Sequence, residues 1–198
     1  MKKILIAAVS FLLLTSCVTT VNRVQLGNQP ELSGYWNAID VRIVCEALIN
    51  ECLTSPRVDQ AVRQSGNRKP AVMVGRFSNQ SDEHIDTELI SSIMETVIFN
   101  SGKLDFVAPQ GLRQELRDER HDQLLYASDE TAASLGKETG ADFMMTGSVR
   151  TIVDRGGNRT VRTYYVTVEL TNIETNERMW LGYNSDITKV ITRPRNSL

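Results

Sequence analysis

Apolar positions near the start of the chain recur at helical spacing in two neighbouring segments. The first predicted helix begins near Tyr35 or Trp36 and carries its apolar face on Val41, Val44, Cys45, Leu48 and Cys52. Ser55 and Pro56 are typical of an N-cap followed by a first-turn proline, and predict a short helix that ends before Gly66. Because apolar stripes need cover, we expect both helices to pack on the rest of the domain.

From Pro70 onward the pattern alternates between strand and helix. Residues 71–77 form a near-continuous apolar run, which is typical of a buried strand. A polar loop over residues 78–85 then leads to Asp86, which can cap a helix that stops at Ser101-Gly102. This strand–loop–helix unit indicates an α/β fold.

The next segment predicts a second strand and two further helices. The strand covers residues 104–108 and ends at Pro109. A charged amphipathic helix follows through Leu112, Leu116 and Leu124-Leu125, and Ser128 or Asp129 caps another helix with Ala132, Ala133 and Leu135.

The remainder of the chain is mostly β. Residues 143–149 predict a strand that extends toward Ile152, and Gly156-Gly157-Asn158 marks a turn. Residues 166–171 alternate cleanly, so valine, valine and leucine face the core, and residues 174–176 close a hairpin onto a last strand through Met179, Trp180, Leu181 and Tyr183. The order predicts one layered α/β domain with a mixed sheet of about five strands flanked by helices.

The N-terminus reads as a targeting segment. Lys2 and Lys3 precede an apolar run over residues 4–14, about half of the roughly 20 residues that a transmembrane helix needs. The run ends at Leu14-Thr15-Ser16-Cys17, which resembles the lipobox of bacterial lipoproteins. That resemblance implies cleavage before Cys17 and acylation of this residue. We therefore expect a signal peptide over 1–16, a lipidated tether over 17–35 and a globular domain over 36–198.

Charge and hydropathy narrow the classes of partner. The formal net charge is −2, and loss of Lys2 and Lys3 makes the mature chain more acidic. This balance does not suggest nucleic acid or a polybasic membrane patch. No second apolar stretch approaches spanning length, so the lipid is the only evident anchor to a membrane.

The cysteines and histidines do not predict a disulfide or a metal site. In a helix, Cys45 and Cys52 would share a face but lie about 10 Å apart, which is beyond disulfide reach. We expect buried free thiols that act as small hydrophobes. His84 and His121 each sit among polar residues without a second cysteine or histidine nearby.

Enzyme signatures are missing from the sequence. It contains no G-x-S-x-G elbow, no P-loop and no dinucleotide-binding glycine fingerprint. Asp82 and Glu83 beside Asp86 resemble paired carboxylates, but solvated residues that favour the helix dipole are the preferred interpretation. We predict no catalytic residue, no cofactor, no metal and no small-molecule substrate.

By elimination the chain is a tethered binding or assembly module, and two polar segments are its candidate contact surfaces. One is the loop Ser78–Ile85, and the other is the charged helix Leu112–Arg120, whose solvated face needs no partner to explain it. The candidate partner-binding residues are Asn79, Gln80, Asp82, Glu83, His84, Arg113, Arg117 and Arg120.

Four segments resemble the LpoB family of penicillin-binding protein activators, over about residues 36–190. They are PAVMVGRFSN (70–79), NSGKLDFV (100–107), GADFMMTGSV (140–149) and VEL (168–170) with ETNERMW (174–180). The resemblance implies a TolB N-terminal-like fold, shared with CsgG-like lipoproteins. It also implies an outer-membrane lipoprotein that binds the periplasmic docking domain of a class A penicillin-binding protein and stimulates peptidoglycan synthesis.

The tether departs from the family pattern. The LpoB tether is long and proline-rich, whereas residues 18–35 hold only Pro30 and reach about 60 Å when fully extended. Val18 after Cys17, in place of aspartate, resembles lipoproteins sorted to the outer membrane.

Two main hypotheses follow, and an enzyme or small-ligand binder is kept as a third alternative. The first is an LpoB-like activator that faces the periplasm and is anchored in the outer membrane. The alternative is a structural or assembly accessory of the TolB/CsgG kind, whose partners lie in the outer membrane and for which a short tether suffices.

Overall fold

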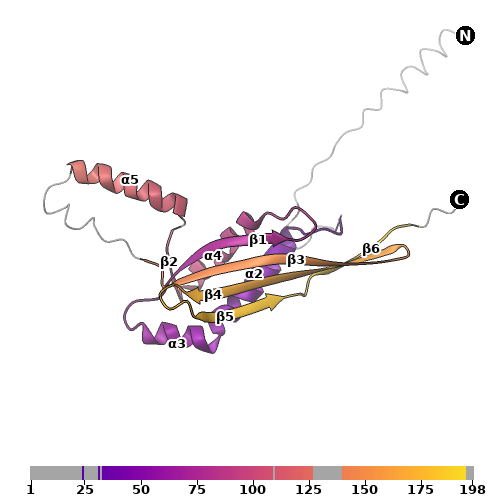
Figure 1. Ribbon diagram of the computed structural model, residues 1–198, viewed down its shortest axis with the longest axis horizontal. Coiled ribbons are helices and arrows are strands. Elements are labelled where there is room, and N and C mark those ends of the chain that lie inside the picture. The colour runs from indigo at the N-terminus through magenta and orange to yellow at the C-terminus, as the bar shows by residue number, and fades with distance from the viewer. Residues whose placement is uncertain (1–23, 25–30, 32, 109, 127–139, 195–198) are drawn as a thin grey trace, which may run out of the picture. The chain divides into compact units, whose positions relative to one another are not determined.

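The computed structural model describes residues 24, 31, 33–108, 110–126 and 140–194. The chain divides into two units, Met1–Glu31 and Leu32–Leu198, and the second contains every described helix and strand. Figure 1 shows these elements. In chain order they are α2 (Ala38–Thr54), α3 (Pro56–Gln64), β1 (Ala71–Gln80), α4 (Thr87–Ser101), β2 (Asp105–Phe106), α5 (Gln110–Tyr126), β3 (Phe143–Gly156), β4 (Arg159–Asn172), β5 (Arg178–Asn184) and β6 (Thr188–Thr192).

A mixed sheet of six strands forms the centre of this unit. The strand order is β2-β1-β3-β4-β5, and β6 pairs with the first residues of β4. β1 runs parallel to β2 and β3, whereas β4 is antiparallel to β3, β5 and β6. The predicted α/β class with a mixed sheet is therefore confirmed, with six strands in place of about five.

Local sequence signals set the ends of the helices. Asn37 caps α2, because its side chain accepts hydrogen bonds from the backbone N–H groups of Ile39 and Asp40. The Asp40 carboxylate in turn accepts a hydrogen bond from the Asn37 backbone N–H, which completes a capping box. Asp86 caps α4 as predicted. Gly102 ends α4 in the left-handed conformation, with φ of 63°, where glycine has no Cβ to clash.

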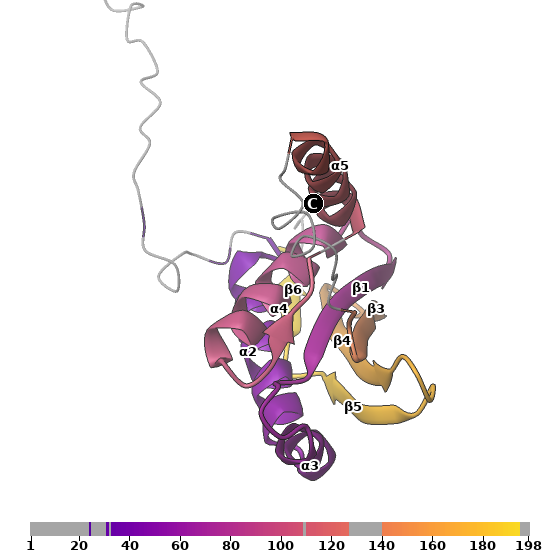
Figure 2. The ribbon, with the colours of Figure 1, turned by 90° about the vertical axis from the view of Figure 1, so that its left-hand side faces the viewer.

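The helices α2 and α4 pack on each other and cover one face of the sheet (Figure 2). The prediction that the first two helices pack on the domain is confirmed, because α2 contacts α4 and β5, and α3 contacts α2 and β5. The predicted alternation in β4 is also confirmed: Val166, Val168 and Leu170 are at most 1% exposed.

The two helical cysteines are buried free thiols, as predicted. Burial raises the pKa of Cys45 and of Cys52 to about 12, with a smaller contribution from Glu46 and Glu51 respectively. A thiolate in this core would lack solvation, so both side chains stay protonated and act as small apolar groups.

Several predicted boundaries were wrong. The first helix begins at Ala38, after Tyr35 and Trp36. Residues 78–80, predicted as loop, continue β1 because they pair with residues 148–150 of β3. The strand predicted over 104–108 shortens to β2, and β6 was not predicted. Cys17, most of the predicted tether and the helix predicted after Ser128 or Asp129 lie outside the described residues.

Candidate functional site

An arginine occupies the core-facing row of β4. Alternate residues of this strand point to the covered face, and the row that ends in Val166, Val168 and Leu170 begins with Arg162 and Tyr164. The Arg162 side chain is only 5% exposed. Because an isolated buried charge is very costly, this guanidinium requires partners.

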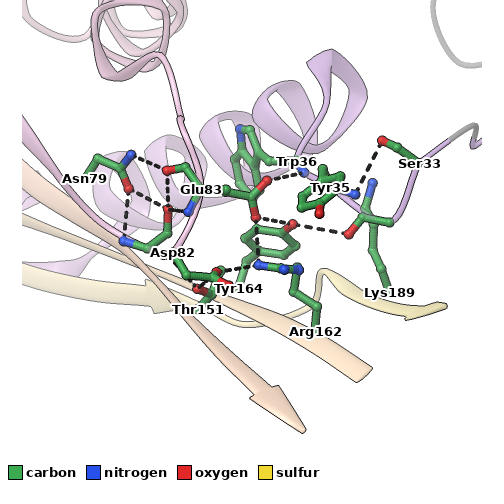
Figure 3. A network of polar contacts seen from close by, with 12 residues as sticks. Ser33, Tyr35, Trp36, Asn79, Asp82, Glu83, Thr151, Arg162, Tyr164 and Lys189 are labelled. Carbon is green, nitrogen blue, oxygen red and sulfur yellow. Dashed lines mark hydrogen bonds and ion pairs between the residues drawn. The ribbon is translucent and has the colours of Figure 1, made fainter. Parts of the chain in front are cut away.

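The loop between β1 and α4 supplies these partners. Arg162 forms ion pairs with Asp82 and with Glu83, whose Oε1 lies 3.3 Å from Nη1 (Figure 3). The Glu83 side chain is 9% exposed, whereas Asp82 is 45% exposed and also accepts a 2.7 Å hydrogen bond from the Thr151 hydroxyl of β3. The two carboxylates, which sequence analysis interpreted as solvated, thus anchor the loop to two strands.

Hydrogen bonds of the Asn79 side chain hold the same loop in shape. The Asn79 side chain donates a 2.8 Å hydrogen bond to the Glu83 carbonyl oxygen. The same side chain accepts hydrogen bonds from the Ser81 backbone N–H at 3.0 Å and from the Ser81 hydroxyl at 2.6 Å. This pattern is typical of an Asx turn, and it fixes the direction in which Asp82 and Glu83 leave the loop.

The residues that lead into α2 complete the network. The Trp36 backbone N–H donates to Glu83 Oε2 at 3.1 Å, and the Tyr164 hydroxyl donates to Glu83 Oε1 at 2.6 Å. The rings of Trp36 and Tyr164 pack with centroids 5.0 Å apart, and the Tyr35 ring centroid lies 5.0 Å from Cζ of Arg162. Glu83 therefore joins the segment before α2, the β1–α4 loop and β4.

A second buried ion pair lies at the start of α2. Lys189 of β6 contacts Asp40 with an Nζ–Oδ2 distance of 2.6 Å, and both side chains are at most 10% exposed. The same Asp40 oxygen accepts the Asn37 backbone N–H at 2.9 Å. This pair fastens the C-terminal strand to the first turn of α2.

The pKa values of the network follow its hydrogen bonds. The Thr151 hydroxyl and the Arg162 guanidinium hold the pKa of Asp82 below its usual range. Burial and the neighbouring Glu83 carboxylate raise the pKa of Tyr164, which stays a protonated donor. Each carboxylate is matched to a donor, so this arrangement is suited to fixing the loop and not to proton transfer.

The candidate contact residues fall into two groups. Asn79, Gln80, Asp82 and His84 present exposed atoms around the network, and Gln80 accepts a 2.7 Å hydrogen bond from Arg150. Glu83 differs from the others. The expectation that its carboxylate is solvated was wrong, because this carboxylate accepts hydrogen bonds from Trp36, Arg162 and Tyr164. Sequence analysis missed these three partners, which lie 47 to 81 residues away along the chain.

The three arginines Arg113, Arg117 and Arg120 share the predicted charged helix, which is confirmed as α5. Arg117 is exposed, while Arg113 and Arg120 are half-buried. A 3.0 Å hydrogen bond between Gln114 and Asp118 links positions i and i+4 of this helix, as expected of a charged surface. The structure gathers the loop residues around Arg162, and keeps the arginines together on α5.

Metal-ligand clusters and surface hollows were the next candidates for a site. No group of three His, Cys, Asp or Glu among them is placed to hold a metal ion. In this part of the chain, no helix combines the length and apolar character needed to cross a bilayer. The hollows are open, including one of about 220 Å³ lined by Thr146, Gly147, Ser148, Thr167 and Glu169 on the uncovered sheet face.

Comparison with known proteins gives a family match. A family model described as the peptidoglycan-synthase activator LpoB matches residues 40–185. The LpoB C-terminal domain from Escherichia coli is 14% identical with a TM-score of 0.45, over 78% of this chain and 99% of that one. The PelC dodecamer from Paraburkholderia phytofirmans is 15% identical with a TM-score of 0.36, over 63% and 74%. No curated protein sequence matches this chain.

Proposed function

The chain belongs to the LpoB family of peptidoglycan-synthase activators, and we propose that it binds and activates a class A penicillin-binding protein. The observation that carries this proposal is the family match over residues 40–185, which spans all of the strands except β6. In this proposal the head is not an enzyme. It acts on the synthase by contact alone, and it takes no cofactor.

Activation by contact requires a difference in affinity. A partner shifts a two-state enzyme only as far as it binds the active state more tightly than the resting state. A tenfold preference corresponds to about 1.4 kcal/mol. A preformed contact surface helps, because a rigid loop loses little conformational freedom on binding. The Asn79 turn and the Arg162 pairs supply this rigidity to the β1–α4 loop.

The exposed residues of that loop are the first proposed contact with the synthase. Asn79, Gln80, Asp82 and His84 are exposed, while Glu83 positions them from beneath through Arg162 and Tyr164. The second proposed contact is α5, which carries Arg113, Arg117 and Arg120 among acidic residues.

The anchor and its membrane are also proposals. Acylation of Cys17 would hold the head at a bilayer, and Val18 favours the outer membrane, with the head in the periplasm. Mass spectrometry of the native protein should find a chain that starts at acylated Cys17. A retained stretch of residues 1–16, or an unmodified thiol, would contradict the anchor.

The activator proposal is tested with purified proteins. The lipid-free chain from Gln29 onward should retain a class A synthase from envelope extracts and raise its glycan polymerisation rate. His84→Ala should weaken this binding without changing the unfolding midpoint, and Arg155→Ala at the exposed β3–β4 hairpin serves as control. Failure to recover any class A synthase, together with normal polymerisation in a deletion strain, would exclude the activator role.

The short tether favours a second candidate function. A reach of about 60 Å keeps the head near its own membrane, as in an assembly accessory of the TolB/CsgG kind. Crosslinking in intact cells distinguishes the two: inner-membrane synthases as partners support activation, and outer-membrane partners alone support the accessory role.

A further inference from the structure

The strand β5 leaves one edge of the sheet open. It hydrogen bonds to β4 along one side, and it is the last strand in the sheet order. Among the described residues, no backbone hydrogen bond reaches its other side. An open edge presents a row of backbone donors and acceptors that matches another extended chain.

The middle of this edge carries no charged residue or proline that would oppose strand pairing. Natural edge strands often carry lysine, proline or an inward-pointing charge. Residues 179–183 of β5 contain none of these, and its outward side chains Leu181 and Tyr183 are 51% and 70% exposed. Exposed apolar side chains beside free backbone groups are features of strand-addition sites.

A helix borders the same edge and creates a groove. The helix α3 contacts β5, and residues beside this contact line an open hollow of about 330 Å³. Ala61 and Met179, both partly buried against the core, supply its apolar part. The rim is polar and consists of Arg57, Gln60, Gln64 and Glu177.

A bulge in β5 orients Met179, one of the residues that line this hollow. Leu170 pairs with Trp180 and Thr171 pairs with Arg178, so Met179 has no partner on β4. A bulge of this kind turns its extra residue out of the regular alternation. Met179 thereby lines the hollow toward α3 instead of standing on the open sheet face.

From this groove we infer that β5 and α3 receive an extended segment of the synthase, which adds to the sheet as a further strand. The inference rests on the proposed function and deepens it. Backbone pairing along β5 gives the affinity, and one apolar side chain of the segment enters the hollow over Ala61 and Met179. An acidic residue of the segment faces Arg57, which has no ion-pair partner among the described residues.

The groove favours a single strand over a second copy of this chain. Four residues of the helix α3 line the hollow, and Met179 of β5 lines it as well. A second copy would bring a whole sheet with its own α3 to the same edge, whereas an extended peptide occupies only the width of one strand, about 4.8 Å. Self-association through β5 is the competing possibility, and the hydrogen-exchange experiment below distinguishes it.

Amide hydrogen exchange provides the first test. The full chain is measured alone and with the periplasmic region of a class A penicillin-binding protein from the same bacterium. We expect exchange of the outward-facing β5 amides to slow at least tenfold in the complex. A complex that forms without this protection overturns the inference and leaves the proposed function standing. Absence of any complex overturns both, and β5 protection in the chain alone at high concentration points to self-association instead.

Matched variants provide the second test. Leu181→Lys places a charge on the open edge and should weaken synthase binding roughly fivefold or more. Val190→Lys is its control, because Val190 is an apolar residue of β6 that is also exposed, at 60%. Arg57→Glu should weaken binding by a few fold through repulsion of the acidic residue. Unchanged affinity for both groove variants, at unchanged unfolding midpoints, overturns the inference.

Discussion

At the scale of single residues, the distinctive feature is a charge in the sheet core. Arg162 is a charged residue in a row of β4 whose other buried members are apolar or aromatic. Its Nε is buried without a hydrogen-bond partner among the described residues, while the outer nitrogen Nη1 contacts Asp82 and Glu83. Such pairs are seldom more stabilising than well-packed apolar groups, but they are sensitive to loss of one partner.

Removal of Arg162 should therefore destabilise the domain strongly. Arg162→Ala leaves the Glu83 carboxylate buried without its cation, and should lower the free energy of unfolding by about 3 kcal/mol. Urea denaturation followed by tryptophan fluorescence measures this loss. Arg155→Ala, an exposed arginine in the same hairpin, should change the free energy by less than about 0.5 kcal/mol. Equal effects for both variants would contradict a structural role for the ion pairs.

The lowered pKa of Asp82 makes the loop sensitive to acid. A carboxyl group with a lower pKa in the folded state than in the unfolded state stabilises the fold above its unfolded pKa. This contribution is lost as the pH falls from about 4 through the folded pKa. The stability difference between wild type and Asp82→Asn should be positive at pH 7 and shrink below pH 4. A difference that stays constant between pH 7 and pH 3 would contradict this role.

Sequence reasoning identified the residue types of the network but not their pairing. The acidic loop was located correctly, yet Glu83 and Arg162 are 79 residues apart, and no local pattern links them. Each residue taken singly is typical of a solvated surface. Only the register of β4, which turns position 162 toward the core, makes the arginine a partner for the loop.

At the scale of elements, periodicity predicted the well-buried helices and strands, and failed where exposure is mixed. The buried face of β4 and both ends of α4 were predicted correctly, because apolar spacing and capping residues are local features of the sequence. The strand β6 escaped prediction because its sequence, TKVIT, carries exposed residues on one side and half-buried residues on the other. Pairing with β4 is what orders it.

The glycine at position 147 of β3 is required by close packing between elements. A Cβ there would lie 2.6 Å from the Thr167 carbonyl oxygen of β4 and would meet the Phe77 ring of β1. Gly147→Ala should lower the free energy of unfolding by about 1–3 kcal/mol through overpacking. Gly156→Ala is the control, since a Cβ at Gly156 meets no atom within 4 Å. Calorimetric melting curves of the two variants measure the difference, and equal melting temperatures would contradict this account.

At the scale of the whole molecule, the first two helices are part of the core and not a hinge. Eight residues of α2 are buried, and they include Val44, Leu48 and Ile49. Deletion of residues 36–66 would expose the opposing faces of α4 and β5. The melting temperature should fall sharply, with loss of a cooperative transition in calorimetry. An unchanged melt would show that these helices do not stabilise the domain.

If Cys17 carries the proposed lipid, the length of residues 18–35 limits how far the head can act from the membrane. Deletion of residues 19–30 removes about 40 Å of maximum reach. Stimulation of the synthase by purified lipid-free protein should be unchanged, whereas activation in cells should be lost if the head must cross toward an inner-membrane enzyme. Wild-type behaviour of the deletion strain would instead indicate a partner near the anchoring membrane, as in the accessory role.

The two buried thiols allow the opening of the folded domain to be measured by their rate of alkylation. Cys45 and Cys52 have negligible exposure and a pKa of about 12, so alkylating reagents find almost no thiolate to attack in the closed molecule. Alkylation then proceeds only through transient opening of α2, and its rate reports how often that opening occurs. In an oxidising compartment, the same protection keeps both sulfurs from mispairing with other cysteine-containing proteins.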